Sequence, residues 1–345
     1  VFFGAITSSG MMEVARKGIF NPEMFMFQDI MFIFMAVMIT DILLLDVFNT
    51  LGMPTSTTVS IVFELLGAAV VISLIKISQN DAESFNAIWN YINYEKASLI
   101  IFGILLSVVV AFSVGALVQF LSRLIYSFNF EKRPNYINAL FGGFAITAIT
   151  YFIIIKGMKG TPFYVDVKHL IEDNTLLIIA GSFLLWTLIS QLLITFFNIN
   201  ILKLIIGIGT FSLAMAFSGN DLVNFVGVPI AAWNSYQVWE TSGISATTFS
   251  MGVLAQKVPS NVFLLLFAGA IMVLTLWTSS KARNVIKTGI DLSRQGEGHE
   301  KFKPNPLSRL VVRASMGINL GLSYIIPAKT IAFVDSKFQK PVIEL

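Results

Sequence analysis

The sequence predicts an all-α polytopic membrane protein, a helical bundle with inverted-topology repeats and broken or re-entrant helices. Hydrophobic residues make up 55% of the 345 residues and charged residues 12%, whereas soluble domains are roughly a quarter charged. A bilayer requires about 20 consecutive apolar residues. Seven runs come close to that length: 29–51, 55–77, 97–126, 137–155, 175–198, 201–218 and 261–280. We therefore expect each of these runs to form a hydrophobic helix or half-helix.

Residues 52–58, Gly-Met-Pro-Thr-Ser-Thr-Thr, interrupt the first apolar stretch without any charged loop. In hydrocarbon, a broken helix is tolerated only where protein or a polar cavity satisfies the freed backbone groups, so such a break usually lines a ligand path. Pro54 suits the first position of a half-helix because its missing N–H would be unpaired there anyway. The hydroxyls of Ser56, Thr57 and Thr58 then lie beside the first-turn N–H groups, which predicts an anion site. The structural alternative is a proline kink whose hydroxyls bond back to the helix.

Three acidic residues flank this break within apolar sequence: Asp41, Asp46 and Glu64. Each acid near the bilayer centre costs about 2.5 to 3.5 kcal/mol on insertion scales. We therefore expect these carboxyl groups to face a polar interior. The structural alternative is that they pair with Lys or Arg side chains of other helices.

Helical spacing groups these acids with other polar residues. Thr57, Ser60 and Glu64 follow at i, i+3 and i+7, which places them on one helical face. That face is expected to point toward the same cavity as the break. Asp46 and Asn49, at i and i+3, are expected to do likewise.

A second polar motif, Ser-Gly-Asn-Asp-Leu-Val-Asn at 218–224, ends the apolar run 201–218. One helical turn brings the amides of Asn220 and Asn224 and the carboxylate of Asp221 to one side. Carbonyl and carboxylate oxygens are hard donors suited to alkali cations, and unwound backbone around the glycine could add more. The motif therefore predicts a cation site, although Gly-Asn-Asp alone is also a common extracellular turn.

Basic residues gather after the last long apolar run, and the positive-inside rule places that segment in the cytoplasm. They are Lys281, Arg283, Lys287, Arg294, Lys301, Lys303, Arg309 and Arg313. Counting spans backward puts 127–136 inside as well, and puts the acid-bearing loops 78–96 and 156–174 outside. Residues 304–327 mix basic and apolar side chains, which is typical of an amphipathic helix lying in the cytoplasmic interface.

An internal repeat relates the two ends of the chain. Thr-Ser-Ser at 7–9 recurs at 278–280, and an apolar helix is expected to run out through each copy into a polar turn. The predicted topology places the first copy outside and the second inside, as inverted-topology repeats require. We accordingly divide the chain into the C-terminal part of a first repeat, connecting helices, the N-terminal part of a second repeat, and a cytoplasmic basic or interfacial segment: 1–126, 127–200, 201–290 and 291–345.

The composition excludes several classes of function. The chain has no cysteine and only two histidines, both in polar loops, so it offers no disulfide, no transition-metal cluster and no catalytic base in the membrane. We predict no enzyme activity and no catalytic residue. The net charge of +3 does not indicate nucleic-acid binding, because the basic residues form no stripe interleaved with aromatic residues. The chain opens inside an apolar run without a signal peptide to interpret, and we expect a piece that lacks both ends of a longer protein.

The two polar motifs resemble those of a known transporter family. Residues 52–58 resemble the Gly-x-Pro-x-Ser-Thr-Thr motif, and residues 219–224 the Gly-Ala-Asn-Asp-Val-Ala-Asn motif, of the inorganic phosphate transporter (PiT) family. Glu-Val-Ala-Arg-Lys-Gly-Ile at 13–19 is similar to the segment that follows the family's first asparagine-rich motif. The resemblance covers nearly the whole chain and is closest to the Bacteroidetes-type branch of the family.

The resemblance implies that each inverted repeat carries both motifs and that phosphate sits between half-helix ends near the midplane, co-transported with sodium or protons. Carried over to this sequence, the phosphate ligands are Thr55, Ser56, Thr57, Thr58 and Asn220. The cation ligands are Asp221 and Asn224, joined by the polar face of Asn49 and Asp46. No cofactor and no resident metal are expected.

The sequence also departs from the family pattern. Val59 stands where the family usually has a histidine after the two threonines, which puts proton handling at that point in doubt. The first asparagine-rich motif would fall upstream of residue 1, and a second Pro-x-Ser-Thr-Thr is absent. Pro-Ala-Lys-Thr at 327–330 is rejected as its counterpart because polar residues follow it.

Together these features predict a secondary active transporter in a bacterial inner membrane that moves inorganic phosphate with a cation, sodium before protons, by alternating access. The alternatives are a sulfate or other oxyanion permease of the same fold, because a helix N-terminus does not distinguish two tetrahedral oxyanions, and a non-transporting fragment. Phosphate, unlike sulfate, can donate a proton to an acid such as Asp46, Glu64 or Asp221. The expected partners are phosphate, Na⁺ or H⁺, lipid and, as one option, a second copy of the chain in a homodimer.

Overall fold

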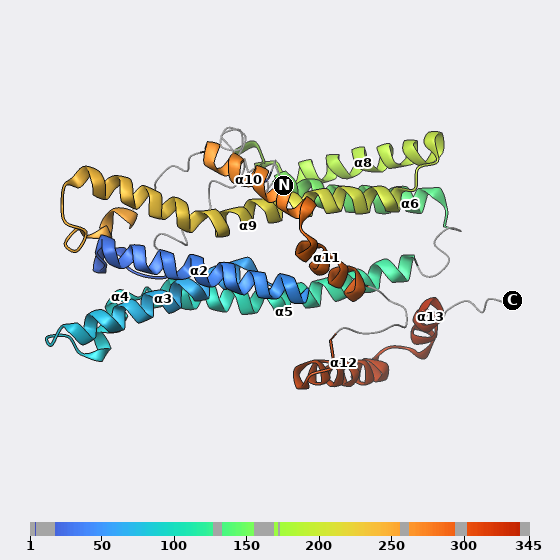
Figure 1. The fold of residues 1–345 in the computed structure, drawn as a ribbon. Helices are drawn as coiled ribbons and strands as arrows, with labels where there is room; N and C mark the ends of the chain where they lie inside the picture. Colours follow the sequence, from blue (N-terminus) through green and yellow to red (C-terminus); the bar gives the residue numbers. More distant parts are fainter. Residues whose placement is uncertain are drawn as a thin grey trace. The chain divides into compact units, whose positions relative to one another are not determined.

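The computed structural model describes Gly4 and residues 18–126, 133–154, 169–171, 173–255, 262–293 and 302–338. The helices of this described part are shown in Figure 1. In chain order they are α2 (Phe27–Leu51), α3 (Thr57–Gln79), α4 (Ile88–Tyr91), α5 (Tyr94–Ile125), α6 (Asn135–Phe152), α8 (Thr175–Phe197), α9 (Ile201–Ser242), α10 (Val262–Thr278), α11 (Ser280–Ser293), α12 (Pro306–Ile325) and α13 (Ala328–Phe338). Short 3-10 helices are η3 (Pro22–Met24), η4 (Phe85–Ala87) and η7 (Met251–Ala255). The predicted all-α class is confirmed.

The chain divides into two compact units. The first comprises Val1–Ile104 with Asn138–Gly289, and the second comprises Leu105–Ile137 with Ile290–Leu345. Both polar motifs belong to the first unit. The division by inverted repeats stays a prediction, since the first Thr-Ser-Ser copy lies outside the described residues.

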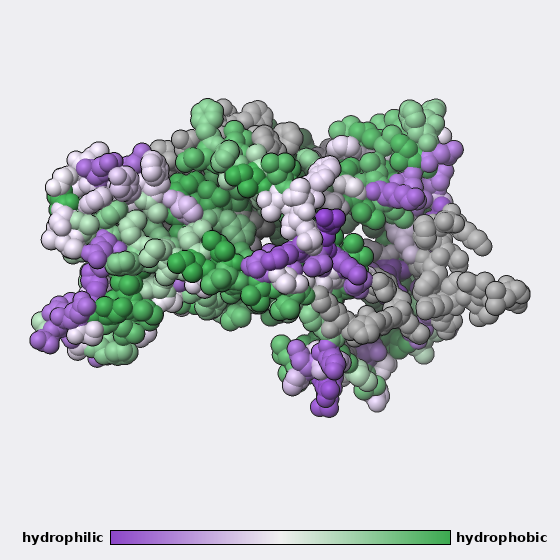
Figure 2. Space-filling model, viewed as in Figure 1, coloured by the Kyte–Doolittle hydropathy of each residue, from purple (hydrophilic) through white to green (hydrophobic). Residues whose placement is uncertain are grey.

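Five helices in the described ranges are long and apolar enough to cross a membrane: Phe27–Leu51, Thr57–Gln79, Tyr94–Ile125, Thr175–Phe197 and Ile201–Ser218. A sixth is added if α10 and α11, bent by 71° relative to each other, form one broken span. Hydrophobic residues also cover much of the surface of the helices, as Figure 2 shows. A helix that is apolar on all sides needs a nonpolar medium or a protein core around it. The chain is therefore a multi-pass membrane protein.

Helices α2 and α3 form an antiparallel pair, and α9 packs against both (Figure 1). The three helices share a core of buried side chains: Ile30, Phe34, Val62, Leu65, Val228 and Ala231. In lipid, such a core is stabilised by close packing and van der Waals contact more than by the exclusion of water. This packing holds the break between α2 and α3 against α9.

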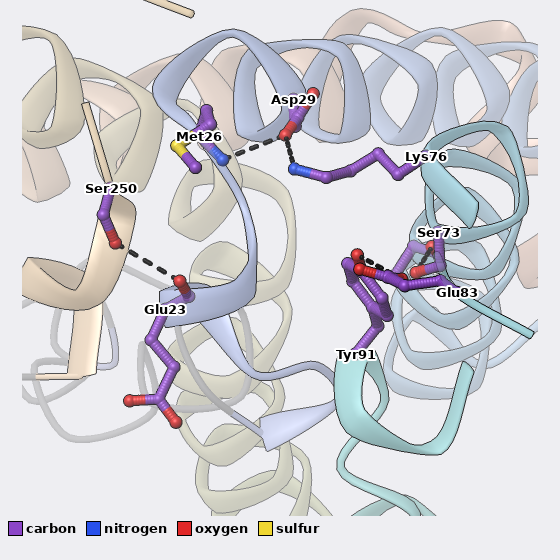
Figure 3. A network of polar contacts seen from close by, with 9 residues as sticks. Glu23, Met26, Asp29, Ser73, Lys76, Glu83, Tyr91 and Ser250 are labelled. Atoms are coloured by element: carbon purple, nitrogen blue, oxygen red, sulfur yellow. Dashed lines mark hydrogen bonds and ion pairs between the residues drawn. The ribbon is translucent and has the colours of Figure 1, made fainter. Parts of the chain in front are cut away.

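A polar network closes the end of the pair where α2 begins and α3 ends (Figure 3). Lys76 Nζ donates to Asp29 Oδ2 at 2.6 Å, and the same oxygen accepts from the Met26 backbone N–H at 2.9 Å. The Tyr91 hydroxyl donates to Glu83 at 3.1 Å. Burial, the hydrogen bond to Glu83 and the nearby negative charges raise the pKa of Tyr91 to about 12. The hydroxyl therefore stays protonated, and remains a donor, at neutral pH.

The loops that flank this pair of helices also meet. The Asn21 backbone N–H donates to the Tyr91 carbonyl at 2.8 Å, and the Asn93 backbone N–H donates to the Ile19 carbonyl at 3.0 Å. The chain entering α2 thus lies beside the chain leaving α3. This contact is compatible with the predicted topology, in which both loops lie on one side of the membrane, and that topology stays a prediction.

The second Thr-Ser-Ser copy marks a bend between two helices, where we expected a polar turn. Helix α10 ends at Thr278 and α11 begins at Ser280. The helix restarts at once because the Ser279 hydroxyl accepts from the Ala282 backbone N–H at 3.2 Å, which satisfies a first-turn donor.

In the second unit, the predicted amphipathic segment 304–327 contains α12. Asn305 caps this helix by accepting from the Ser308 backbone N–H at 2.7 Å. The helix is confirmed, and its position in the cytoplasmic interface stays a prediction.

Two glycines let α6 approach α8 closely. A Cβ added at Gly143 would clash with Thr187, at 2.9 Å from its Cβ and 3.0 Å from its Cα. A Cβ added at Gly142 would lie 2.8 Å from Ser190 Oγ. Small residues at such contacts are typical of membrane interiors, because they allow helix backbones to pack closely.

We predict that Gly143→Ala destabilises the protein by about 1 to 3 kcal/mol, because the added methyl group overpacks against the Thr187 backbone. Gly181→Ala, in α8, is the control, since nothing lies within 4 Å of the position that its Cβ would take. Thermal unfolding in detergent measures both variants. A melting temperature of Gly143→Ala equal to that of the wild type contradicts the described packing.

Candidate functional site

The break between α2 and α3 is a tight turn that starts at Gly52. This glycine adopts the left-handed conformation, with φ 62° and ψ 38°, which residues other than glycine rarely adopt. The Met53 backbone N–H reaches back to the Phe48 carbonyl at 2.8 Å, and the Gly52 N–H donates to the Asn49 carbonyl at 3.1 Å. Two of the last carbonyl groups of α2 are thereby satisfied.

Helix α3 begins at Thr57, so the predicted helix start at Pro54 is wrong. Ser56 is the N-cap, and its hydroxyl accepts from the Val59 backbone N–H at 3.4 Å. Serine satisfies a first-turn donor in this way, whereas proline has no side-chain acceptor. The helix then runs for 23 residues to Gln79, so the expected half-helix is long enough to cross a membrane. The depth of the break in the bilayer stays a prediction.

The two polar motifs meet at the start of α3. The Asn224 side-chain amide, on α9, donates to the Thr57 hydroxyl at 3.1 Å and to the Thr58 hydroxyl at 2.9 Å. These partners are separated by 167 and 166 residues in the chain, and the contact is partly buried. Each such hydrogen bond contributes about 1 kcal/mol net. The contact brings the predicted anion site and the predicted cation motif to one place.

Helix α9 continues through the second motif, so the expected unwinding around Gly219 is wrong. The helix runs unbroken from Ile201 to Ser242. Leu222, inside the motif, and Ile230 of α9 pack with Leu265 of α10 in a buried cluster. This packing supports a regular helix and overrides the tendency of Gly-Asn-Asp to form a turn.

The side chains of Asn220 and Asp221 lie outside the described part of the structure. Their register positions in α9 are four and three residues before Asn224. Residues at these spacings share one face of a helix, here the face that meets α3 through Asn224. Their predicted roles as ligands of phosphate and cation stay predictions.

Asp46 pairs with a basic residue of another helix, which was the alternative to its facing a polar interior. Its Oδ1 accepts from Lys281 Nζ, on α11, at 2.5 Å. Asn49 lies in the last turn of α2 with a half-buried side chain. Among the described contacts, none joins either residue to Asn224, and their assignment as cation ligands stays a prediction.

The residues of the predicted polar face of α3 do not all point to the same place. Thr57 contacts Asn224, whereas Ser60 and Glu64 line a cavity against α2. The three positions spread over about 60° around the helix axis, which is enough to separate them. On the cavity side the Ser60 hydroxyl donates to Glu64 Oε1 at 2.6 Å, and Asp41 is buried nearby on α2.

This cavity has a volume of about 680 Å³ and is lined by α2, α3 and the break between them. Most of the lining is apolar, and the polar side chains are those of Thr40, Thr55, Ser56, Ser60 and Glu64. Polar groups thus extend from the helix start to two turns inside α3. Within the described ranges, no three His, Cys, Asp or Glu side chains come together to hold a metal ion.

Sequence reasoning missed two partners. In the sequence, Lys281 served only as one of the basic residues that indicate the cytoplasmic side. A lysine at the end of an apolar helix could also have suggested a partner for Asp46. The proximity of Asp41 to the Ser60 and Glu64 pair was also missed, because spacing within α3 contains no information about the facing position on α2.

Comparison with known proteins identifies the family. A model of the Phosphate transporter family matches residues 1–290 of the chain. No match was found among curated proteins or among solved structures. The matched region includes both polar motifs, the first of which is the break, and the Asn224 contact between them. The chain therefore belongs to the phosphate transporter family.

Proposed function

We propose that this chain carries inorganic phosphate across the membrane together with a cation, with sodium as the first candidate. Membership of a phosphate transporter family supports phosphate as the substrate and transport without catalysis. The observation that carries the proposal is the pair of hydrogen bonds from Asn224 to Thr57 and Thr58. It joins the hydroxyl-rich helix start to the asparagine motif, which supports a shared site for the proposed anion and cation ligands.

The start of α3 has the chemistry of a phosphate site. The first-turn N–H groups and the positive end of the helix dipole favour an anion. Thr55 and Ser56 are exposed and line the cavity, and Thr57 and Thr58 follow in the first turn. Asn220, on α9, would add a side-chain amide.

In this proposal the cation lies beside the phosphate, bound by Asp221 and Asn224. A cation there offsets the charge of the anion, which is a physical reason for the two to move together. Asn49 and Asp46 complete the ligand set. Asp46 would take part by exchanging Lys281, its present partner, for the cation.

Apolar sequence lies on both sides of Asn224 along α9. Ile201–Ser218 is apolar enough to cross a membrane, and on the other side Trp239 stacks on Phe27, with ring centroids 4.5 Å apart. In this proposal the binding site lies inside the membrane, between these two parts of α9. Alternating access of two inverted repeats around that site, in a bacterial inner membrane, completes the proposed mechanism, and a homodimer is compatible with it.

Thr58→Val should lower phosphate uptake, and its effect should not add to that of Asn224→Ala. Valine keeps the shape of threonine and removes the hydroxyl that accepts from Asn224. Because the two residues form one contact, we expect a coupling energy of about 0.5 to 3 kcal/mol in a double-mutant cycle. Radiolabelled phosphate uptake by proteoliposomes containing the full-length protein, and thermal unfolding in detergent, measure the cycle.

Thr210→Val is the matched control, because the exposed Thr210 hydroxyl bonds the Ile206 carbonyl within its own helix at 2.7 Å. This variant should retain the uptake of the wild type. If Thr58→Val and Asn224→Ala each leave uptake unchanged, the site assignment is wrong.

Phosphate uptake should depend on Na⁺ and should resist competition by sulfate. Near neutral pH phosphate can donate a proton to an ionised carboxylate, which only accepts, whereas sulfate cannot. Uptake is measured in sodium or choline buffers, across pH, with an excess of unlabelled sulfate or phosphate. Equal inhibition by both anions at every pH would favour the oxyanion permease, and uptake driven by a proton gradient without Na⁺ would assign the coupling to protons.

A further inference from the structure

A buried pair of acids lies between α2 and α3, in addition to the Asn224 contact. Asp41 of α2 is 3% exposed, and its carboxyl group interacts with Glu64 and Ser60 of α3. The Ser60 hydroxyl, itself buried, donates to Glu64 Oε1 at 2.6 Å. Two carboxyl groups and one hydroxyl from neighbouring helices therefore converge.

This cluster has too few hydrogen-bond donors. A serine has one hydroxyl hydrogen, and an ionised carboxylate has none. Ser60 gives its hydrogen to one oxygen of Glu64, while the other, Oε2, is enclosed and has no hydrogen-bond partner in the described structure. Two ionised carboxylates in a nonpolar site repel each other and lack hydration. The cluster therefore requires a positive charge, either a proton on one carboxyl group or a bound cation.

The other titratable or charged groups on the elements packed around the cluster are Asp29, Asp46, Lys76, Tyr91, Lys203, Asp221, Tyr236 and Glu240. Lys281 of α11 also reaches α2, where it is engaged in an ion pair with Asp46. Lys76 is engaged in an ion pair with Asp29 at the far end of the helix pair. Among the groups that the structure describes, Glu64 is the charged one that acts on Asp41. None of the described side chains therefore supplies the positive charge.

We propose that Asp41, Ser60 and Glu64 form a site for a monovalent cation, a proton or Na⁺, that drives transport. Oxygen ligands suit hard cations, and Na⁺ and the proton are the cations that the proposed symport requires. A proton would sit on one carboxyl group and hydrogen-bond to the other, whereas Na⁺ would be held by both carboxylates and the hydroxyl. The inference rests on the proposed transport of phosphate, and it adds a site separate from the ligands on α9.

The cavity connects this cluster to the candidate phosphate site. Ser56 and Glu64 both line it, and the helical rise between them corresponds to about 12 Å along α3. A cation bound at the cluster removes negative charge that would repel an anion entering the same cavity. Occupation of the cluster therefore favours phosphate binding at Ser56, which couples the two ions.

Cation binding in the absence of phosphate tests the site directly. If Na⁺ is the ion, NaCl should raise the melting temperature of the purified full-length protein above its value in choline chloride at equal ionic strength. Glu64→Gln and Asp41→Asn should then weaken the apparent Na⁺ affinity by at least about tenfold. If the proton is the ion, NaCl has no such effect, and the infrared band of a protonated carboxyl group in the wild type disappears in both variants.

Glu240→Gln is the matched control, because it makes the same charge change at an exposed position of α9. It should retain the Na⁺ response and the carboxyl band of the wild type. Ser60→Ala keeps both acids and removes one ligand, so it should weaken cation binding even if the acid variants do not fold.

Transport assays distinguish an error in this site from an error in the proposed function. In proteoliposomes, Glu64→Gln should lose cation-driven phosphate uptake by at least about tenfold while it retains exchange of phosphate for phosphate. The site is overturned if Asp41→Asn, Glu64→Gln and Ser60→Ala all keep the Na⁺ response, the carboxyl band and the cation-driven uptake of the wild type. No phosphate uptake by the wild type, with cation binding intact, would refute the proposed function alone.

Discussion

A polar group inside a membrane must find its partner within the protein, because hydrocarbon offers none. The hydrogen bonds from Asn224 to Thr57 and Thr58 meet this requirement where α2 ends and α3 begins. The surrounding features position this contact. Gly52 ends α2 in the left-handed conformation, Ser56 caps α3, and an unbroken α9 holds Asn224 against the start of α3. The hydroxyl-rich helix start therefore depends on a side chain from a distant part of the chain.

The acids of α2 meet this need for a partner within the protein in different ways. Asp29 and Asp46, toward the two ends of the helix, each pair with a lysine of another helix. Asp41, between them, faces the acid Glu64. The pairing of Asp46 with Lys281 joins residues 235 apart, so spacing within α2 does not identify Lys281 as the partner. Asp29 and Asp46 are thus paired with a positive charge in this structure, whereas no described basic side chain pairs with the central acids.

Charge also connects the site to its function. A phosphate ion at the start of α3 and a cation at nearby oxygens would together carry less net negative charge than the phosphate alone. The loaded protein would then have less charge to move through a nonpolar medium. Ser56 and Glu64 line the same cavity, so the two proposed ions would lie close to each other. In this proposal, electrostatic attraction between the two ions is sufficient to couple their transport.

The sequence by itself determined the class, the helices and the family, because hydropathy and motif spacing are local properties that a bilayer constrains directly. It located the break at 52–58 but misplaced the helix start, since spacing does not say that Ser56 provides the cap. Only the tertiary structure decided that α9 stays helical through Gly219 and that Asn224 meets Thr58. Packing of α10 on α9 outweighs the local preference for a turn, and a contact across 166 residues depends on how three helices pack together.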